Sequence, residues 1–216
     1  MNSINSIITS KLNIINNDIK LISPKTQLLA VTKNTSLENI QILYDLGVRN
    51  FGENRVTQLM ERSEFFKHKG LIDINWHMIG KIQSNKINKL KSVYNLKFIH
   101  SIDSIKLLEK FKDSEIKLFI QINTSEETEK SGFISIEKLK DLNILSYENI
   151  VGLMTMSKLR TDNFVHDAEI CFKKLSLFKD HLNKNYLLSM GMSNDYKIAL
   201  KYKSDFIRVG SFLFSK

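Results

Sequence analysis

Short apolar runs alternate with longer segments of helical spacing along almost the whole chain, and this alternation restricts the fold more than any other feature. Strands that alternate with helices pair in parallel through right-handed crossovers. Eight repeats favour closure into a barrel over an open sheet. The sequence therefore predicts an α/β fold, a single (β/α)8 TIM-type barrel with an additional N-terminal helix, as one domain over residues 1–216. The predicted strands are residues 27–32, 49–51, 75–79, 97–102, 117–123, 150–156, 186–190 and 205–209.

The segments between the predicted strands carry start and stop signals for helices. Thr35 and Glu38 form a capping-box pattern, and Gly47 suits the left-handed residue that ends a helix. Gly70 stands in the same position after the next helical segment. Apolar residues at three- and four-residue steps predict further helices within residues 56–66, 105–111, 136–142, 164–182 and 194–203.

The chain is short for a barrel of this kind. It has 216 residues, whereas a typical (β/α)8 barrel has about 250. Only residues 210–216 follow the eighth predicted strand, which is too few for a full outer helix. Residues 6–22 have apolar residues near helical spacing, so we expect this N-terminal segment to cover that part of the barrel.

The charge balance alone could indicate a nucleic-acid partner, because 32 Lys and Arg residues stand against 23 Asp and Glu residues, a net charge of +9. The distribution of these charges argues against such a partner. Most of the basic residues are lysines scattered among Asn and Ile, and they form no single stripe. We therefore expect no nucleic-acid partner and keep a basic nucleic-acid-binding protein as a weaker alternative.

Cysteine usage and hydropathy indicate the compartment. Cys171 is the single cysteine and cannot form an internal disulfide, which favours a reducing compartment. It falls on the apolar stripe of the helix at 164–182, where a small buried residue is expected. No Cys and His spacing suggests a metal site, no run approaches the roughly 18 apolar residues of a membrane span, and no signal peptide is visible. We expect a cytoplasmic monomer without a metal or a membrane partner.

The barrel predicts where function lies, because the carboxyl ends of parallel strands share one mouth. Lys33 directly follows a run of buried type at 28–31. Desolvation at the inner end of the strand would lower the pKa of its ammonium, and the free amine attacks aldehydes. A lysine extended along the barrel rim is the alternative interpretation. Two interpretations of His77 stay open: a residue near the same mouth, or a buried structural histidine bonded to backbone.

The ends of the last two predicted strands have the composition of a phosphate site. Residues 190–193 and 208–211 each present a glycine and a serine, Ser193 in the first and Ser211 in the second. The loops after these strands often bind phosphate in (β/α)8 barrels, and we expect Ser193 at the start of a helix whose dipole favours an anion. A phosphorylated aldehyde would engage both Lys33 and this site. Pyridoxal 5′-phosphate is the cofactor with both groups.

Short motifs in register along most of the chain resemble those of the pyridoxal phosphate homeostasis proteins, a family of barrels similar to the N-terminal domain of alanine racemase. Each motif alone is moderately specific, but the combination is highly specific. The motifs are AVTK at 30–33, FGEN at 51–54, WHMIG at 76–80, HSID at 100–103, QIN at 121–123 with KSG at 130–132, GLM at 152–154 and LSMGMS at 188–193.

The resemblance implies a set of cofactor-binding residues. Lys33 would be the Schiff-base lysine, and Arg208 would face the pyridine nitrogen. The chain departs from the family pattern at Asn34 to Ser36, where the usual proline is absent, and at Arg55, where tyrosine is common, so the shape of the first loop stays open. The implied set is Lys33, Asn54, Met154, Met192, Ser193, Arg208, Gly210 and Ser211.

The expected function is non-catalytic. A guanidinium does not give its proton to a pyridine, so a ring held by Arg208 stays neutral and stabilises a carbanion poorly. Racemisation needs two acid/base groups, and Lys33 is the one convincing candidate. The protein is expected to hold pyridoxal phosphate as a lysine aldimine and to store it, buffer it or supply it to pyridoxal-phosphate-dependent apo-enzymes. A pyridoxal-phosphate-dependent amino-acid racemase or decarboxylase on the same barrel is the alternative.

Overall fold

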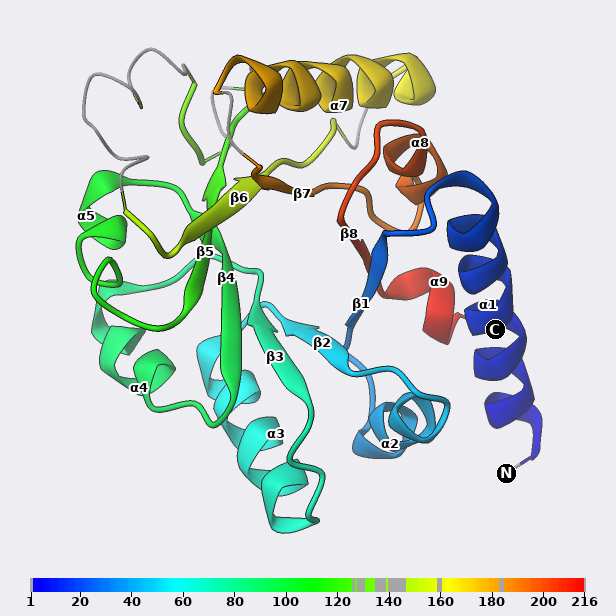
Figure 1. Ribbon diagram of the computed structural model, residues 1–216. Coiled ribbons are helices and arrows are strands. Elements are labelled where there is room, and N and C mark those ends of the chain that lie inside the picture. Colours follow the sequence, from blue (N-terminus) through cyan, green and yellow to red (C-terminus); the bar gives the residue numbers. More distant parts are fainter. Residues whose placement is uncertain are drawn as a thin grey trace.

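The structure is a computed structural model that describes residues 2–125, 127, 131–134, 139, 147–158, 161–182 and 185–215. In these residues eight parallel strands close into a barrel in chain order, with β1 paired to β8 (Figure 1). All eight predicted strands are present, and each boundary lies within two residues of the predicted one. The strands are β1 (Gln27–Val31), β2 (Asn50–Glu53), β3 (Asn75–Met78), β4 (Leu96–Ile102), β5 (Lys117–Gln121), β6 (Ile150–Met154), β7 (Leu187–Ser189) and β8 (Phe206–Val209).

Helices lie on the outside of the barrel (Figure 1). The sequence analysis misses α4 and the short 3₁₀ helix η1 before it, because Ile87 and Leu90 are too few apolar positions to show a period. Of the helix predicted at 136–142, only Leu139 is described, and it is buried. The described helices are α1 (Asn2–Ile22), α2 (Leu37–Asp45), α3 (Val56–His68), η1 (Ser84–Lys86), α4 (Ile87–Lys91), α5 (Ile105–Leu108), α7 (Phe164–His181), α8 (Tyr196–Lys201) and α9 (Ser211–Phe214).

The N-terminal helix α1 covers the barrel wall beside β1 and α9. It packs against α2, α8, α9 and β1, beside the single turn of α9 that follows β8 (Figure 1). Its inner face buries Ile8, Leu12 and Ile15. The hydroxyl of Tyr196 on α8 donates a hydrogen bond to Asp18 Oδ2 on α1, at 2.7 Å. The expectation that the N-terminal segment covers this part of the barrel is therefore confirmed.

Helix α2 begins one residue later than its sequence pattern suggests. Ser36 is the N-cap, and its side chain accepts a hydrogen bond from the N–H of Asn39 at 3.3 Å. The prediction of Thr35 as the N-cap is wrong, because the N–H of Thr35 closes a turn onto the carbonyl of Thr32 at 3.1 Å. The predicted stop is confirmed, since Gly47 has a φ of 91°.

Alternate strand residues fill the interior of the barrel and face its outer helices. The strand residues that point outward, such as Ala30 and Trp76, pack between the strands and the helices in the larger hydrophobic cluster. Side chains along a strand alternate between the interior and the outer helices. The last inward-facing residue of each strand is therefore the one nearest the mouth. The inner cluster contains Leu29, Phe119, Met154 and Phe206.

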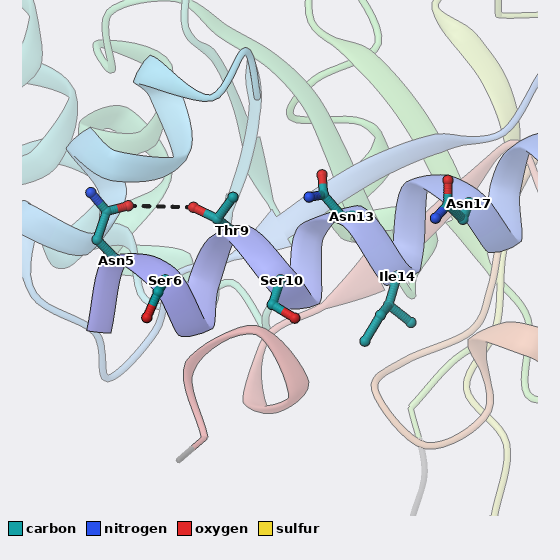
Figure 2. Close-up of a pocket in the computed structure, with 7 residues that line it drawn as sticks. All are labelled: Asn5, Ser6, Thr9, Ser10, Asn13, Ile14 and Asn17. Atoms are coloured by element: carbon teal, nitrogen blue, oxygen red, sulfur yellow. Dashed lines mark hydrogen bonds between the residues drawn. The ribbon is translucent and has the colours of Figure 1, made fainter. Parts of the chain in front are cut away.

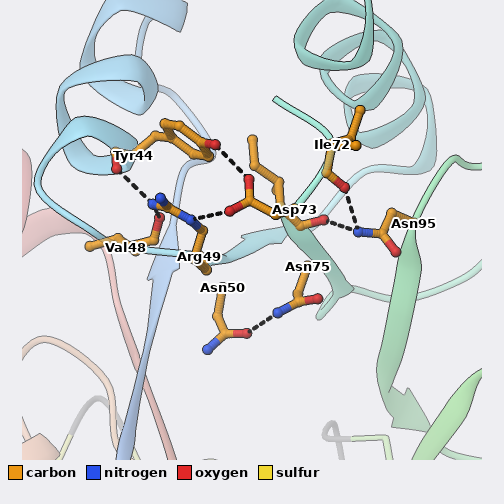
Figure 3. Close-up of polar contacts among 9 residues, drawn as sticks. Tyr44, Val48, Arg49, Asn50, Ile72, Asp73, Asn75 and Asn95 are labelled. Carbon is orange, nitrogen blue, oxygen red and sulfur yellow. Dashed lines mark hydrogen bonds and ion pairs between the residues drawn. The ribbon is translucent and has the colours of Figure 1, made fainter. Parts of the chain in front are cut away.

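Polar side chains fasten the loops at the amino-terminal ends of β2, β3 and β4 (Figure 3). Arg49 Nε lies 2.6 Å from Asp73 Oδ2, and Arg49 Nη1 donates to the carbonyl of Tyr44 at 2.7 Å. The Tyr44 hydroxyl also donates to Asp73, at 2.5 Å. Asn95 Nδ2 donates to the carbonyl of Ile74 at 2.5 Å. These bonds join successive loops to one another, which is the structural role expected of this end of a barrel.

Cys171 lies on α7 and is buried beside Phe172 and Leu175, as its position on the apolar stripe predicts. Burial in this setting makes it a packing residue. Among the helices that the structure describes, none is both long enough and apolar enough to cross a membrane.

Candidate functional site

A pocket of about 320 Å³ opens at the carboxyl-terminal mouth of the barrel. This volume is at the lower end of the range, roughly 300 to 1,000 Å³, that small-molecule sites occupy. Seven of the eight predicted site residues line it: Lys33, Asn54, Met192, Ser193, Arg208, Gly210 and Ser211. The other described lining residues are Val31, Ile79, Met156, Phe164, Asn194 and Asp195.

Met154 lies below the pocket and does not line it. Its side chain is buried in the inner cluster with Phe119 and Phe206. Met156, two residues further on and therefore of the same parity, lines the pocket instead. Alternation predicts whether a strand residue faces inward, but not how far below the mouth it lies. The cofactor contact implied for Met154 stays a prediction.

Lys33 stands in a tight turn that follows β1. The hydrogen bond from the Thr35 N–H to the Thr32 carbonyl closes this turn, and Asn34 has a φ of 65°. Asparagine adopts this left-handed conformation more readily than most residues, so the turn forms without the usual proline. The Lys33 side chain is exposed. The expectation of a desolvated ammonium is therefore wrong, because β1 ends at Val31 and the turn carries Lys33 beyond the strand ends.

Donors from the loop after β8 converge on a residue of the loop after β7. The backbone N–H groups of Gly210 and Phe212 both donate to Ser193 Oγ, each at 3.2 Å. A Cβ atom at Gly210 would lie 2.9 Å from the carbonyl oxygen of Val31, so this close approach requires glycine. Ser193, Gly210 and Ser211 thus line one edge of the pocket, and an anion in place of the Ser193 hydroxyl would face the same backbone donors.

Asp195 is a buried, charged pocket residue that the sequence analysis misses. It is the N-cap of α8, which begins two residues later than predicted, so Ser193 precedes this helix and does not start it. Its buried carboxylate accepts hydrogen bonds from the Met192 N–H and the Ser157 hydroxyl, each at 2.5 Å. These bonds tie the β7–α8 loop, which lines the pocket, to itself and to Ser157. The sequence signal is ambiguous because the preceding Ser and Asn are equally good N-cap residues.

Arg208 is a buried cation at the floor of the pocket, with 5% of its surface exposed. Its Nη1 donates to Ser189 Oγ at 2.8 Å, and its Nη2 donates to the Thr155 carbonyl at 2.9 Å. Burial lowers the pKa of Arg208 to about 10, and the nearby charge of Asp195 opposes this shift. The guanidinium therefore remains protonated at neutral pH.

A chain of hydrogen bonds continues from Arg208 through the barrel interior. His100 Nδ1 lies 2.8 Å from Ser189 Oγ, and His100 Nε2 lies 2.9 Å from His77 Nδ1. His77 Nε2 lies 3.3 Å from Asn50 Oδ1. Because this amide oxygen can only accept, His77 carries its proton on Nε2 and accepts from His100, which in turn accepts from the Ser189 hydroxyl.

Both histidines are structural residues of the interior and do not reach the mouth. Each ring stacks on a phenylalanine, His77 on Phe98 and His100 on Phe119. Desolvation lowers the pKa of His77 to about 3, and it also holds the pKa of His100 well below the ordinary value. The structural interpretation of His77 is therefore confirmed, although its partners are side chains and not backbone.

Two relatives decide the family. The chain is 34% identical over 200 residues to the pyridoxal phosphate homeostasis protein of Schizosaccharomyces pombe, a match that covers 87% of this chain and 82% of the relative. It is 32% identical over 228 residues to the Homo sapiens protein of the same name, covering 92% of this chain and 78% of that one. The chain belongs to the pyridoxal phosphate homeostasis protein family.

Solved structures support the fold of this chain. PipY of Synechococcus elongatus PCC7942, solved with pyridoxal phosphate bound, superposes with a TM-score of 0.82 at 30% identity, covering 96% of this chain and 100% of PipY. Alanine racemase of Corynebacterium glutamicum superposes with a TM-score of 0.66 at 13% identity, covering 96% of this chain and 60% of the racemase. The racemase shares the barrel fold alone. No protein-family model matches the chain.

A larger recess of about 710 Å³ runs along the outer face of α1 (Figure 2). All of its described lining residues belong to α1, and none of them is charged. Within the residues that the structure describes, no group of three or more His, Cys, Asp or Glu side chains is placed to hold a metal ion. The described groups suited to bind an anion and an aldehyde therefore meet at the mouth pocket, and α1 serves as a covering helix.

Proposed function

We propose that this chain binds pyridoxal 5′-phosphate in the mouth pocket with Lys33 as the covalent anchor, and that it stores, buffers or supplies the cofactor to apo-enzymes that depend on it. The observation that carries the proposal is that one pocket brings together an exposed amine, a convergent set of anion donors and a buried guanidinium. The family membership and the PipY structure with pyridoxal phosphate bound support it.

The residues present fit the chemical groups of this cofactor. Ser193, Gly210 and Ser211 would hold the phosphate, with the Gly210 N–H exchanging its present bond to Ser193 Oγ for one to the anion. Arg208 would hold the ring nitrogen. The bound cofactor would supply an aldehyde, and Lys33 would supply the amine that reacts with it. The apolar walls that would receive the ring are Val31, Ile79, Met156 and Met192.

The same pocket supports a binding role without catalysis. Of its described lining residues, Lys33, Asp195 and Arg208 are ionisable. The Asp195 carboxylate is occupied by the Met192 N–H and the Ser157 hydroxyl, and Arg208 keeps its proton at neutral pH. No described lining group is therefore poised as a second base opposite Lys33, which racemisation would need.

Absorbance spectra with borohydride reduction test the anchor. We expect purified protein given pyridoxal 5′-phosphate to gain a visible absorbance band, and borohydride to remove this band and fix a pyridoxyl group on Lys33, located by peptide mapping. Lys33→Ala should abolish the fixed adduct and retain weak phosphate-dependent binding. Failure of the wild-type chain to take up the cofactor would refute the proposal.

A panel of amino acids separates the binding protein from an enzyme on the same barrel. We expect neither a change in chirality nor release of carbon dioxide when the loaded protein is incubated with each amino acid. Turnover that Lys33→Ala abolishes would instead identify a racemase or a decarboxylase.

A further inference from the structure

A buried ion pair stands directly behind the turn that carries Lys33. Arg62 of α3 contacts the carboxylate of Glu53 at the end of β2, and the two side chains are 8% and 0% exposed. Arg62 Nη1 also donates to the carbonyl of Thr32, and its Nη2 donates to the carbonyl of Thr35, both at 2.6 Å. One guanidinium therefore binds both ends of the four-residue turn 32–35.

The carboxylate that anchors Arg62 is itself held in place. The Thr32 hydroxyl donates to Glu53 Oε1. The Gln58 amide, in the orientation that satisfies both of its ends, donates to Glu53 Oε2 and accepts from Arg62 Nη2, each at 3.1 Å. The arginine is thus fixed by strand β2 and helix α3, so the turn cannot move independently of the barrel wall.

The turn requires such support. Asn34 holds a φ of 65°, a left-handed conformation that asparagine tolerates better than most residues but that still has a conformational cost. Within the turn, one backbone hydrogen bond closes residues 32–35. Arginine suits the role because its planar fork carries five donors in fixed directions, whereas a lysine ammonium cannot span two carbonyls and a carboxylate in the same way.

We propose that Arg62 is a positioning residue for Lys33: by binding the carbonyls of Thr32 and Thr35, it holds the turn in the conformation that presents the lysine amine to the mouth pocket. The inference rests on the proposed function of Lys33 as the anchor. Arg62 does not line the pocket, so it acts through the turn and not through the cofactor.

Two ligands separate positioning from binding in the test. Pyridoxal 5′-phosphate reports covalent capture, and pyridoxine 5′-phosphate, which lacks the aldehyde, reports binding by the phosphate and ring contacts alone. In Arg62→Lys we expect capture at Lys33, measured by absorbance and borohydride trapping, to slow about tenfold to a hundredfold. We expect the dissociation constant of pyridoxine 5′-phosphate to stay within about twofold of the wild-type value.

Arg49→Lys is the matched control, because Arg49 also binds a carboxylate and two carbonyls, but at the amino-terminal end of the barrel. It should leave both measurements unchanged. If circular dichroism shows that Arg62→Lys is unfolded, Glu53→Gln replaces it. This variant keeps the size of the side chain and removes the negative charge that holds Arg62.

Each outcome decides the proposal. Slower capture with unchanged pyridoxine 5′-phosphate binding supports the positioning role. Unchanged capture, or an equal loss for both ligands, overturns it. A wild-type chain that binds pyridoxine 5′-phosphate but never traps pyridoxal 5′-phosphate at Lys33 would instead show that the proposed anchor has failed.

Discussion

Individual residues at the mouth are charged and yet buried, and each of them is paired. Arg208 is bonded to Ser189 and Thr155, and Asp195 accepts from two donors. A buried charge without such partners is strongly unfavourable. The pocket therefore depends on complete sets of contacts, and a substitution of one partner affects the other partner as well.

Gly210 gives a prediction at the residue scale. In Gly210→Ala the new Cβ would lie 2.9 Å from the carbonyl oxygen of Val31, so the loop that carries Ser211 must shift. We expect affinity for pyridoxal 5′-phosphate to fall roughly tenfold, about 1.4 kcal/mol. Equilibrium titration followed by absorbance measures it. Gly47→Ala is the control: its φ of 91° makes alanine unfavourable, so stability should fall while affinity is retained.

Among the elements, α1 shows how a short chain completes a barrel wall. The turn α9 is too short to cover β8 and β1, and the apolar face of α1 packs beside it. Ile8 and Ile15 are fully buried in this interface, whereas Ile14 is 43% exposed on the opposite face. The helix is thus part of the hydrophobic core that stabilises the barrel.

The contrast between two adjacent isoleucines on α1 gives the prediction at this scale. Ile15→Ala should lower the free energy of unfolding by about 2 to 5 kcal/mol, because it leaves a cavity against the barrel. Ile14→Ala should change it by about 0.5 kcal/mol or less. Urea denaturation followed by circular dichroism measures both. Equal effects for the two variants would show that α1 does not pack as described.

Across the whole molecule, the histidine chain links the mouth to the opposite end of the barrel. It runs from Arg208 to Asn50, and Asn50 also accepts from Asn75 at the amino-terminal end (Figure 3). The loops at that end fasten the barrel, and the loops at the other end form the pocket. The buried histidines between them are neutral, so their protonation affects the stability of the molecule as a whole.

Stability should therefore depend on pH below neutrality. The pKa of His77 is about 3 in the folded chain and 6.5 ordinarily, so between these values the unfolded chain binds more protons. The free energy of unfolding is expected to rise with pH in this window. The contribution of His77 is lost progressively as the pH falls from 6.5 towards 3. Where this histidine is protonated in the unfolded chain and neutral in the folded chain, the free energy of unfolding changes by about 1.4 kcal/mol per pH unit.

Urea denaturation at a series of pH values tests this dependence. His77→Gln should reduce its slope by about 1.4 kcal/mol per pH unit near pH 5. His68→Gln should leave the slope unchanged, because the His68 side chain is 79% exposed. Equal slopes in the wild type and His77→Gln would contradict the buried, neutral state of His77.

Local sequence patterns were enough to predict the strands, the barrel and most of the pocket-lining residues. Alternation of apolar runs is a local property, and the mouth collects the strand ends wherever the barrel closes, so Lys33, Ser193, Arg208 and Gly210 could be placed together in advance. Local signals also fixed the stop at Gly47.

The depth, burial and pairing of side chains at the mouth depend on how the chain folds as a whole. Met154 and Met156 have the same parity, and their different depths follow from where β6 ends in the closed barrel. The exposure of Lys33, the role of Asp195 and the contact of Arg62 with the Lys33 turn likewise depend on residues distant in the sequence. Such contacts exist only after closure brings separate strands together, and for this reason no local pattern predicts them.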